Sequence, residues 1–170
     1  FIGIGGIGVS AIARMMLLRG SKVSGSDSAK SMVTDELEKV GAKFFLGQEA
    51  KNIPEDANLI VYSPAVQDTN PELVRARELK IPTLSYPEVL GLISNTHYTI
   101  AVAGTHGKTT TTGMLAKVFI DAKKDPTVII GSFLRDFKSN FVAGFSDYFI
   151  VEACEYKRSF LNLWPSIGII

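Results

Sequence analysis

"FIGIGGIGVSAIA" (residues 1–13) runs from the end of an apolar strand through a glycine-rich turn into a helix. Gly3, Gly5 and Gly8 have the spacing G-x-G-x-x-G, and Gly6 opens the turn further. Glycines at this spacing let backbone N–H groups approach a diphosphate closely. The stretch therefore predicts an α/β fold with a phosphate-binding loop, and on these residues alone the expected ligand is NAD.

Strands and helices alternate along the chain after this loop. The patterns predict helices over residues 7–19, 33–40 and directly after Asn70, and strands over residues 22–27, 43–47, 58–66 and 81–85. Short strands that alternate with helices indicate a parallel sheet with helices on both faces. In such a sheet an acidic residue about 20 positions after the glycines contacts a ribose, and Asp27 occupies that position.

The pattern restarts near residue 97. "YTIAVAG" (residues 98–104) predicts a strand, residues 107–122 a helix, and residues 126–131 and 147–153 two further strands. We expect residues 132–147 to form a loop with one short strand near Phe141. The chain is therefore predicted to hold two domains, residues 1–96 and residues 97–170.

A second glycine loop, Gly104-Thr105-His106-Gly107-Lys108-Thr109, follows the strand at residues 98–104. It directs N–H groups, a helix dipole and an ammonium at phosphates, with the Thr109 hydroxyl available to Mg²⁺. The strict G-x-x-x-x-G-K-[ST] pattern is not met, because Val102 stands five positions before Gly107. A glycine turn with a surface lysine is the alternative, and His106 could contact either nucleotide or metal. A dehydrogenase has no role for this second loop.

A carboxylate for the metal is expected at the end of a neighbouring apolar strand, and Glu152 ends the run at residues 148–152. We assign Thr109 and Glu152 to Mg²⁺, which prefers oxygen ligands. A solvated strand end is the alternative for Glu152. We expect Cys154 to be a small buried side chain without a catalytic role, since no histidine is placed to activate it.

Composition excludes some partners. Eighteen Lys and Arg against 17 Asp and Glu give a net charge of +1, with no basic run longer than Lys123-Lys124, so no nucleic-acid partner is expected. No apolar run reaches the roughly 18 residues of a membrane span, so no membrane partner is expected. The single cysteine excludes an internal disulfide and fits a reducing cytosol. Because both ends lie inside apolar stretches, we expect a fragment of a longer protein.

Several motifs occur in the order found in Mur ligases, which the chain resembles over essentially its whole length. They are "GIGGIGVSAIA", "GSD", "NPE", "AVAGTHGKTTTT" and "VEACEYKRSFL". The resemblance implies a Rossmann-like domain that holds a UDP-sugar rather than NAD, followed by the start of a P-loop-type α/β domain that holds ATP. It assigns the UDP-sugar to Gly3, Gly5, Gly6, Gly8, Asp27 and Ser63. It assigns ATP to Gly104, Thr105, His106, Gly107, Lys108, Thr109 and Thr110.

The activity that this resemblance implies is cytoplasmic and belongs to peptidoglycan precursor synthesis. ATP would phosphorylate the carboxylate of UDP-N-acetylmuramate, and L-alanine would attack the acyl phosphate, with Lys108 as the catalytic residue and Mg²⁺ bound. Cys154 and Lys157 replace two acids that are usual in the family. The chain alone is expected to be inactive, because the family's acceptor domain is absent.

Three alternatives stay open. Two are ligases, one that attaches a recycled murein tripeptide to the same sugar nucleotide and one of the folylpolyglutamate type. The third belongs to another class, a dinucleotide-binding oxidoreductase or regulatory module. The sequence does not predict the oligomeric state.

Overall fold

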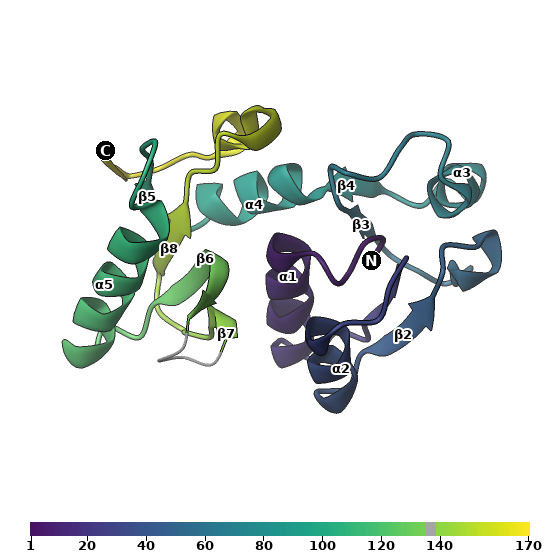
Figure 1. The fold of residues 1–170 in the computed structure, drawn as a ribbon, viewed down its shortest axis with the longest axis horizontal. Helices are drawn as coiled ribbons and strands as arrows, with labels where there is room; N and C mark the ends of the chain where they lie inside the picture. The colour runs from purple at the N-terminus through teal and green to yellow at the C-terminus, as the bar shows by residue number, and fades with distance from the viewer. Residues whose placement is uncertain (135–138) are drawn as a thin grey trace. The chain divides into compact units, whose positions relative to one another are not determined.

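The computed structural model describes residues 1–134 and 139–170 (Figure 1). The chain divides into two compact units, Phe1–Tyr86 and Pro87–Ile170. This boundary precedes the one predicted at residue 96, because most of helix α4 (Tyr86–Asn95) belongs to the second unit.

The first unit contains a parallel sheet built around residue Ile2. Its strands are β1 (Ser24–Asp27), β2 (Lys43–Leu46), β3 (Ile60–Tyr62) and β4 (Thr83–Ser85). The pairs β1–β2 and β3–β4 are parallel, and Ile2 forms parallel bridges to Ser26 on one side and Tyr62 on the other. The N-terminal segment thus lies at the centre of the sheet, as the predicted α/β architecture requires.

Four helical segments accompany this sheet: α1 (Ile7–Leu18), α2 (Met32–Lys39), the 3₁₀ segment η1 (Ala50–Asn52) and α3 (Pro71–Glu78). α1 and α2 pack beside each other over one hydrophobic cluster, which includes Ile4 and Leu37. α3 covers a second cluster, which includes Ile2 and Leu73. The predicted helices at 7–19, at 33–40 and after Asn70 are therefore confirmed to within one or two residues at most ends.

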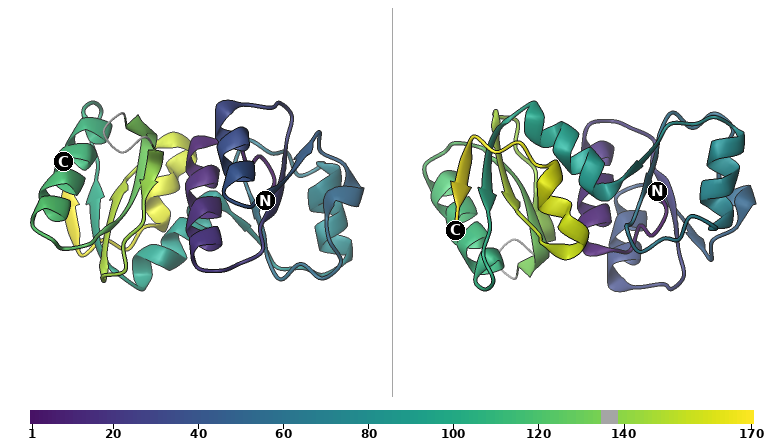
Figure 2. Two further views of the ribbon diagram at one scale, coloured as in Figure 1. Left: turned by 90° about the horizontal axis from the view of Figure 1, so that it is seen from below. Right: turned by 90° about the horizontal axis from the view of Figure 1, so that it is seen from above.

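The second unit is a five-stranded sheet in the order β7-β6-β8-β5-β9. Its strands are β5 (Tyr98–Val102), β6 (Thr127–Leu134), β7 (Ser139–Val142), β8 (Tyr148–Glu152) and β9 (Ile167–Ile169). Only the β6–β7 pair is antiparallel among these described strands. Helix α5 (Lys108–Asp121) packs on β5, β6 and β8 (Figure 2), and Ala116 meets Val128, Ile130 and Ile150 in the core beneath it.

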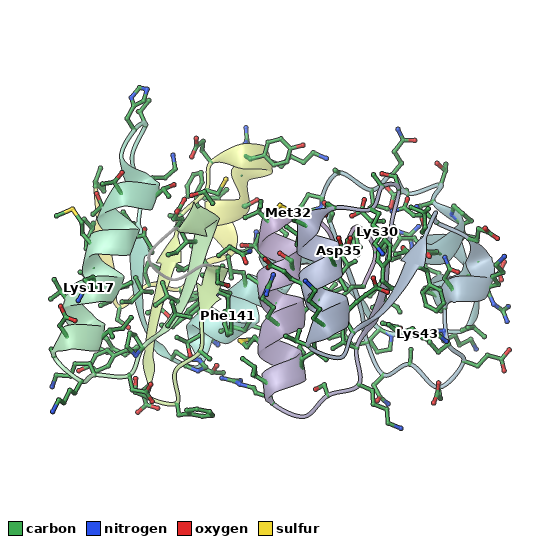
Figure 3. The ribbon with its side chains drawn as sticks, turned by 60° about the horizontal axis from the view of Figure 1, so that its bottom comes forward. Lys30, Met32, Asp35, Lys43, Lys117 and Phe141 are labelled. Carbon is green, nitrogen blue, oxygen red and sulfur yellow. The ribbon has the colours of Figure 1, made fainter. Side chains whose placement is uncertain are left out.

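Two features of this sheet differ from the prediction. β6 continues to Leu134, so residues 132–134 are strand rather than loop, while residues 135–138 lie outside the described part. β9 was not predicted, yet it pairs in parallel with β5 through Ile100 and Ile167. The short strand near Phe141 is confirmed as β7, on which Figure 3 marks that residue.

Helix α4 is fixed to the end of the second unit by two contacts. Ser94 Oγ accepts a hydrogen bond of 3.0 Å from the Trp164 N–H, and a Cβ at Gly91 would lie 2.5 Å from the Asn162 carbonyl oxygen. These contacts explain why the unit boundary falls before α4. Over residues 1–134 and 139–170, no helix has the length and apolar character needed to cross a membrane.

Candidate nucleotide-binding sites

A cavity of about 720 Å³ lies in the first unit, at the carboxyl ends of its strands. Its lining is formed mainly by small and uncharged polar residues: Gly3, Gly5, Gly6, Asp27, Ser28, Ala29, Ser31, Gln48, Ser63, Ala65, Val66, Gln67, Thr69, Asn70 and Pro71. Such a position in an α/β sheet is where ligands bind. Five of the six residues assigned to the sugar nucleotide lie together here: Gly3, Gly5, Gly6, Asp27 and Ser63.

The glycine loop that borders this cavity leaves no space for side chains. A Cβ at Gly3 would lie 3.0 Å from the Cβ of Ser63, and Gly3 also has a left-handed φ of +76°. A Cβ at Gly5 would lie 2.9 Å from Oδ2 of Asp27. Both positions therefore require glycine for close approach of the loop to the neighbouring strand ends.

Asp27 is held by the loop itself. The Gly5 N–H donates a hydrogen bond of 2.8 Å to Oδ2 of Asp27. The Gly5 N–H is therefore occupied by Asp27, and this bond fixes the carboxylate at the cavity wall. The carboxylate also puts a negative charge on the cavity wall, a feature that suits a sugar hydroxyl better than a second anion.

Gly8 has a different environment from the other glycines of the motif. A Cβ there would lie 2.5 Å from Cζ of the Tyr86 ring, so the absence of a side chain lets α1 pack against Tyr86. Gly8 is not among the described residues that line the cavity. Its assignment to the sugar nucleotide stays a prediction, whereas its packing role is visible directly.

The second glycine loop joins β5 to α5. Gly104 has φ +132° and Gly107, the N-cap of α5, has φ +80°. Unlike the first loop, this one leaves room for a side chain: the nearest atoms to a Cβ would lie at 3.4 Å at Gly104 and 4.0 Å at Gly107. Glycine is needed here for the backbone angle, which brings the N-terminal N–H groups of α5 into the turn.

Lys108 lies at the first position of α5 with its ammonium already engaged. Its Nζ donates 2.7 Å to the Gly104 carbonyl oxygen and forms an ion pair of 2.9 Å with Oε2 of Glu155. The Lys108 side chain is 14% exposed and that of Glu155 67%. The hydrogen bond from Lys108 holds the pKa of the Glu155 carboxyl below its ordinary value. Glu155 was not among the site residues predicted from the sequence.

Glu155 reaches Lys108 because the chain turns sharply after β8. It precedes the 3₁₀ segment η2 (Tyr156–Asn162), inside which Lys157 and Arg158 have φ values of 48° and 56°. Two consecutive non-glycine residues in the left-handed region are uncommon, and no periodicity in the sequence predicts them. Glu155 and Lys108 follow the ends of β8 and β5, so their ion pair depends on the pairing of two strands that are far apart in the sequence.

Glu152, the predicted metal ligand, ends β8 opposite Val102 of β5. The loop that carries Lys108 and Thr109 follows β5, so Glu152 and that loop lie at the same edge of the sheet. Oε1 of Glu152 accepts a hydrogen bond of 2.9 Å from the Gly131 N–H, which fixes the carboxylate over β6. Among the described residues, no three His, Cys, Asp or Glu side chains gather as a metal site.

Cys154 was expected to be buried, and this expectation is wrong: its side chain is exposed. The reason is that β8 ends at Glu152, and the Cys154 N–H then donates 3.1 Å back to the Glu152 carbonyl in a turn. His106 is likewise exposed on the second loop.

Several cavity residues were missed by the sequence analysis, notably Gln48, Gln67 and Asn70. Gln48 follows the end of β2, and Gln67 and Asn70 lie between β3 and α3. Their position after strand ends is the signal that would have identified them, because the carboxyl ends of parallel strands share one edge of the sheet.

The family profile "Mur ligase family, catalytic domain" matches residues 1–98. The chain belongs to the Mur ligase family. The matched region contains the first glycine loop, Asp27 and Ser63, and it ends before Gly104. This membership confirms the family resemblance of the motifs and the predicted α/β fold.

Named relatives and solved structures extend this match across the whole chain. The UDP-N-acetylmuramate–L-alanine ligase of Clostridium kluyveri is 50% identical over 171 residues, which is 100% of this chain and 37% of that protein. The UDP-N-acetylmuramate–alanine ligase of Thermotoga maritima has a TM-score of 0.85 at 33% identity, covering 99% of this chain and 39% of its own.

A third relative has another acceptor in its name. The UDP-N-acetylmuramate:L-alanyl-γ-D-glutamyl-meso-diaminopimelate ligase of Neisseria meningitidis has a TM-score of 0.89 at 28% identity, with 98% of this chain and 57% of that one covered. The chain thus spans little more than a third of the length of the curated relatives that it matches.

Proposed function

We propose that this chain carries the two nucleotide sites of an ATP-dependent amide ligase that joins L-alanine to UDP-N-acetylmuramate in peptidoglycan precursor synthesis. The first unit would bind the UDP-sugar, and the loop at residues 104–110 would bind ATP. The muramate carboxylate would be phosphorylated and then attacked by the amine of L-alanine. The observation that carries the proposal is the presence of two separate glycine-rich turns that each lead into a helix, because redox chemistry with NAD needs only one phosphate-binding turn.

The residues of the second loop fit a nucleoside triphosphate. Gly104 and Gly107 form a turn at the N-terminus of α5, and Lys108 contributes a cation that is nearly enclosed. Such a turn stabilises phosphate oxygens through N–H groups, the helix dipole and the ammonium. Lys108 would exchange Glu155 for a phosphate oxygen and stabilise the charge on the group in transfer.

The residues present also fit Mg²⁺. Thr109 and Glu152 offer a hydroxyl and a carboxylate, both hard oxygen donors, at one edge of the sheet. Mg²⁺ is commonly held by one or two such groups together with phosphate oxygens and water, so a cluster of three acidic side chains is not needed. When bound, the ion would neutralise phosphate charge.

A second candidate is the ligase that attaches a murein tripeptide to the same sugar nucleotide. The similarity to the Neisseria meningitidis enzyme favours it, because the TM-score is as high as for the alanine ligase. The identity of 50% to an L-alanine ligase favours the first proposal. Both candidates share the two nucleotide sites and a cytoplasmic location, where ATP and UDP-sugars are made.

Calorimetric titration of the chain with UDP-N-acetylmuramate and with NAD tests the first site. We expect binding of the UDP-sugar and none of NAD. Tight NAD binding without a response to the UDP-sugar would refute the proposal and favour an oxidoreductase or regulatory module.

The metal assignment is tested by comparing Glu152→Ala with Cys154→Ala. Glu152→Ala should remove the Mg²⁺ dependence of ATP binding, because it deletes the carboxylate. Cys154→Ala should leave it unchanged, since Cys154 is exposed and a thiol is a poor ligand for Mg²⁺. If both variants fold and lose the Mg²⁺ dependence of ATP binding equally, the assignment of Glu152 rather than Cys154 to the metal is wrong.

A further inference from the structure

Glu72, in the first turn of α3, is a buried acidic residue that neither glycine loop explains. Only 1% of its surface is exposed. Its carboxylate accepts two hydrogen bonds, 2.5 Å from the Ser26 hydroxyl and 2.7 Å from Nδ2 of Asn52. Ser26 belongs to β1 and Asn52 to η1, so Glu72 joins three segments that are far apart in the sequence.

Each of these segments leads directly to the cavity. Ser26 precedes Asp27, whose carboxylate is on the cavity wall. Asn52 uses the same amide group to donate 3.0 Å to the Gly47 carbonyl, and the next residue, Gln48, lines the cavity. Ser26 is therefore adjacent in the chain to a cavity residue, and Asn52 is connected to another through the Gly47 carbonyl.

Asn70 closes the network into a ring. Its Oδ1 accepts the Glu72 N–H at 2.9 Å as the cap of α3, and its Nδ2 donates 2.7 Å to Oε1 of Gln48. Asn70 and Gln48 both line the cavity. The bond between Asn70 and Gln48 orients the amide groups of both residues. The Glu72 carboxylate reaches this pair through Asn52 and the Gly47 carbonyl, because the cap bond itself comes from the backbone N–H of Glu72.

Stability alone does not account for a carboxylate at this place. Burial of an ionisable group costs free energy, which two uncharged donors return only in part, and an apolar side chain would fill the same space at lower cost. The position in the first turn of α3 offsets part of that cost through the helix dipole. What the carboxylate supplies is a fixed geometry among the three segments.

We propose that Glu72 is a positioning residue of the sugar-nucleotide cavity, which holds Asp27, Gln48 and Asn70 in the arrangement that binds a uridine nucleotide. This inference rests on the proposed function of the first unit. Glu72 does not contact the ligand itself, and its carboxylate acts through Ser26 and Asn52.

The test compares the affinity of the 170-residue chain for UDP in the wild type, Glu72→Gln and Glu78→Gln. Glu72→Gln keeps the shape but turns one acceptor into a donor that faces Ser26 or Asn52. We expect it to weaken UDP binding by about tenfold or more. Glu78 lies on the same helix and its side chain is 60% exposed, so Glu78→Gln should bind UDP as the wild type does.

Two additions separate positioning from a general loss of fold. Affinities are measured well below the melting temperatures of all variants, and the side-chain amide NMR resonances of Gln48 and Asn70 are recorded without ligand. These resonances should shift in Glu72→Gln and stay in place in Glu78→Gln. If Glu72→Gln fails to fold, Ser26→Ala removes a single donor and should weaken UDP binding by about threefold.

The outcomes separate the positioning role of Glu72 from the sugar-nucleotide site itself. UDP binding that is unchanged in folded Glu72→Gln, or in Ser26→Ala where the first variant does not fold, overturns the positioning role alone. A wild-type chain that does not bind UDP refutes the proposed sugar-nucleotide site, and the positioning role with it.

Discussion

The two glycine loops of this chain use glycine for different reasons. In the first loop Gly5 and Gly8 are needed for space, because a Cβ at Gly8 would lie 2.5 Å from Tyr86 and one at Gly5 would lie 2.9 Å from Asp27, while Gly3 has a left-handed φ as well as a close neighbour. In the second loop the need is for a left-handed backbone, because Gly107 has φ +80° and open surroundings. Similar sequence patterns therefore differ in structure: close packing requires glycine only in the first loop, where Gly3 alone of the motif also has a left-handed φ, whereas the second loop requires glycine for its backbone angles alone.

The loops also differ in how each holds a carboxylate. Asp27 is bonded to a backbone N–H and belongs to a sheet strand, so it forms a permanent part of the first cavity. Glu155 is bonded to a side-chain ammonium, is 67% exposed and precedes a 3₁₀ segment. An ion pair whose carboxylate is exposed to water is screened and easily exchanged. The first carboxylate should remain when ligand binds, whereas the second should yield to phosphate.

The largest effect is expected from loss of the second loop's cation. Lys108→Ala should weaken binding of Mg²⁺–ATP to the chain by about 10- to 100-fold, because a charged hydrogen bond to phosphate is lost. Lys117→Ala on the same helix is the matched control, since Lys117 is exposed and paired with Asp121 (Figure 3). Calorimetry measures the affinity of both variants for Mg²⁺–ATP. If Lys108→Ala binds as tightly as the wild type, this loop does not bind ATP.

The glycine comparison is tested by a crossed pair of substitutions. Gly8→Ala should destabilise the first unit by about 1–3 kcal/mol through overpacking, and Gly8→Asn should be worse because it is larger. At Gly107 the order should reverse. Gly107→Ala should cost about 1 kcal/mol through backbone strain, and Gly107→Asn less, because asparagine tolerates the left-handed region.

Urea unfolding of the four variants measures these free energies. The proposed difference between Gly8 and Gly107 is refuted if asparagine lowers the free energy of unfolding more than alanine does at both positions. It fails equally if Gly8→Ala leaves the free energy of unfolding unchanged.

A smaller effect is expected at the metal edge of the second unit. A Cβ at Gly131 would lie 2.7 Å from Oε2 of Glu152, so Gly131→Ala should displace the carboxylate and weaken Mg²⁺-dependent ATP binding by about fivefold. Gly168→Ala in β9 of the same sheet is the control, because nothing lies within 4 Å of its Cβ position. Equal affinities in the two variants would argue against Glu152 as a metal ligand.

The smallest effect concerns pH. The pKa of Glu155 is lowered by its hydrogen bond from Lys108, so the pairing stabilises the fold above the ordinary carboxyl pKa. That contribution disappears as the pH falls through the lowered value. In Lys108→Met the pKa of Glu155 should rise toward its ordinary value, while Lys117→Met should leave it in place. An NMR titration of the carboxyl group measures the pKa of Glu155. If this pKa is the same in Lys108→Met as in the wild type, the ion pair does not form in solution.

Much of the fold was predictable because it depends on local patterns. The alternation of strands and helices, the cap of α3 by Asn70 and the place of Asp27 at the end of β1 all follow from residues close together in the chain. Five residues that the glycine motif and the family resemblance assign to the sugar nucleotide line the first cavity: Gly3, Gly5, Gly6, Asp27 and Ser63.

The features that escaped prediction depend on contacts between distant segments. Gly8 meets Tyr86, and β9 pairs with β5, although nothing near either position specifies its partner. Glu155 meets Lys108 because each follows the end of one of two paired strands, Glu155 after β8 and Lys108 after β5. Such contacts are properties of the folded chain and not of any short stretch of it.

The central claim is that each glycine loop binds a different nucleotide. Residue-resolved NMR titration of the chain with UDP-N-acetylmuramate and then with Mg²⁺–ATP tests this claim most directly. The UDP-sugar should shift the amide resonances of Gly3, Gly5, Gly6 and Ser63 and leave those of residues 104–110 unchanged, and Mg²⁺–ATP should do the reverse. Shifts of the same loop by both ligands, or of the first loop by NAD alone, would contradict the assignment of two nucleotides to two loops.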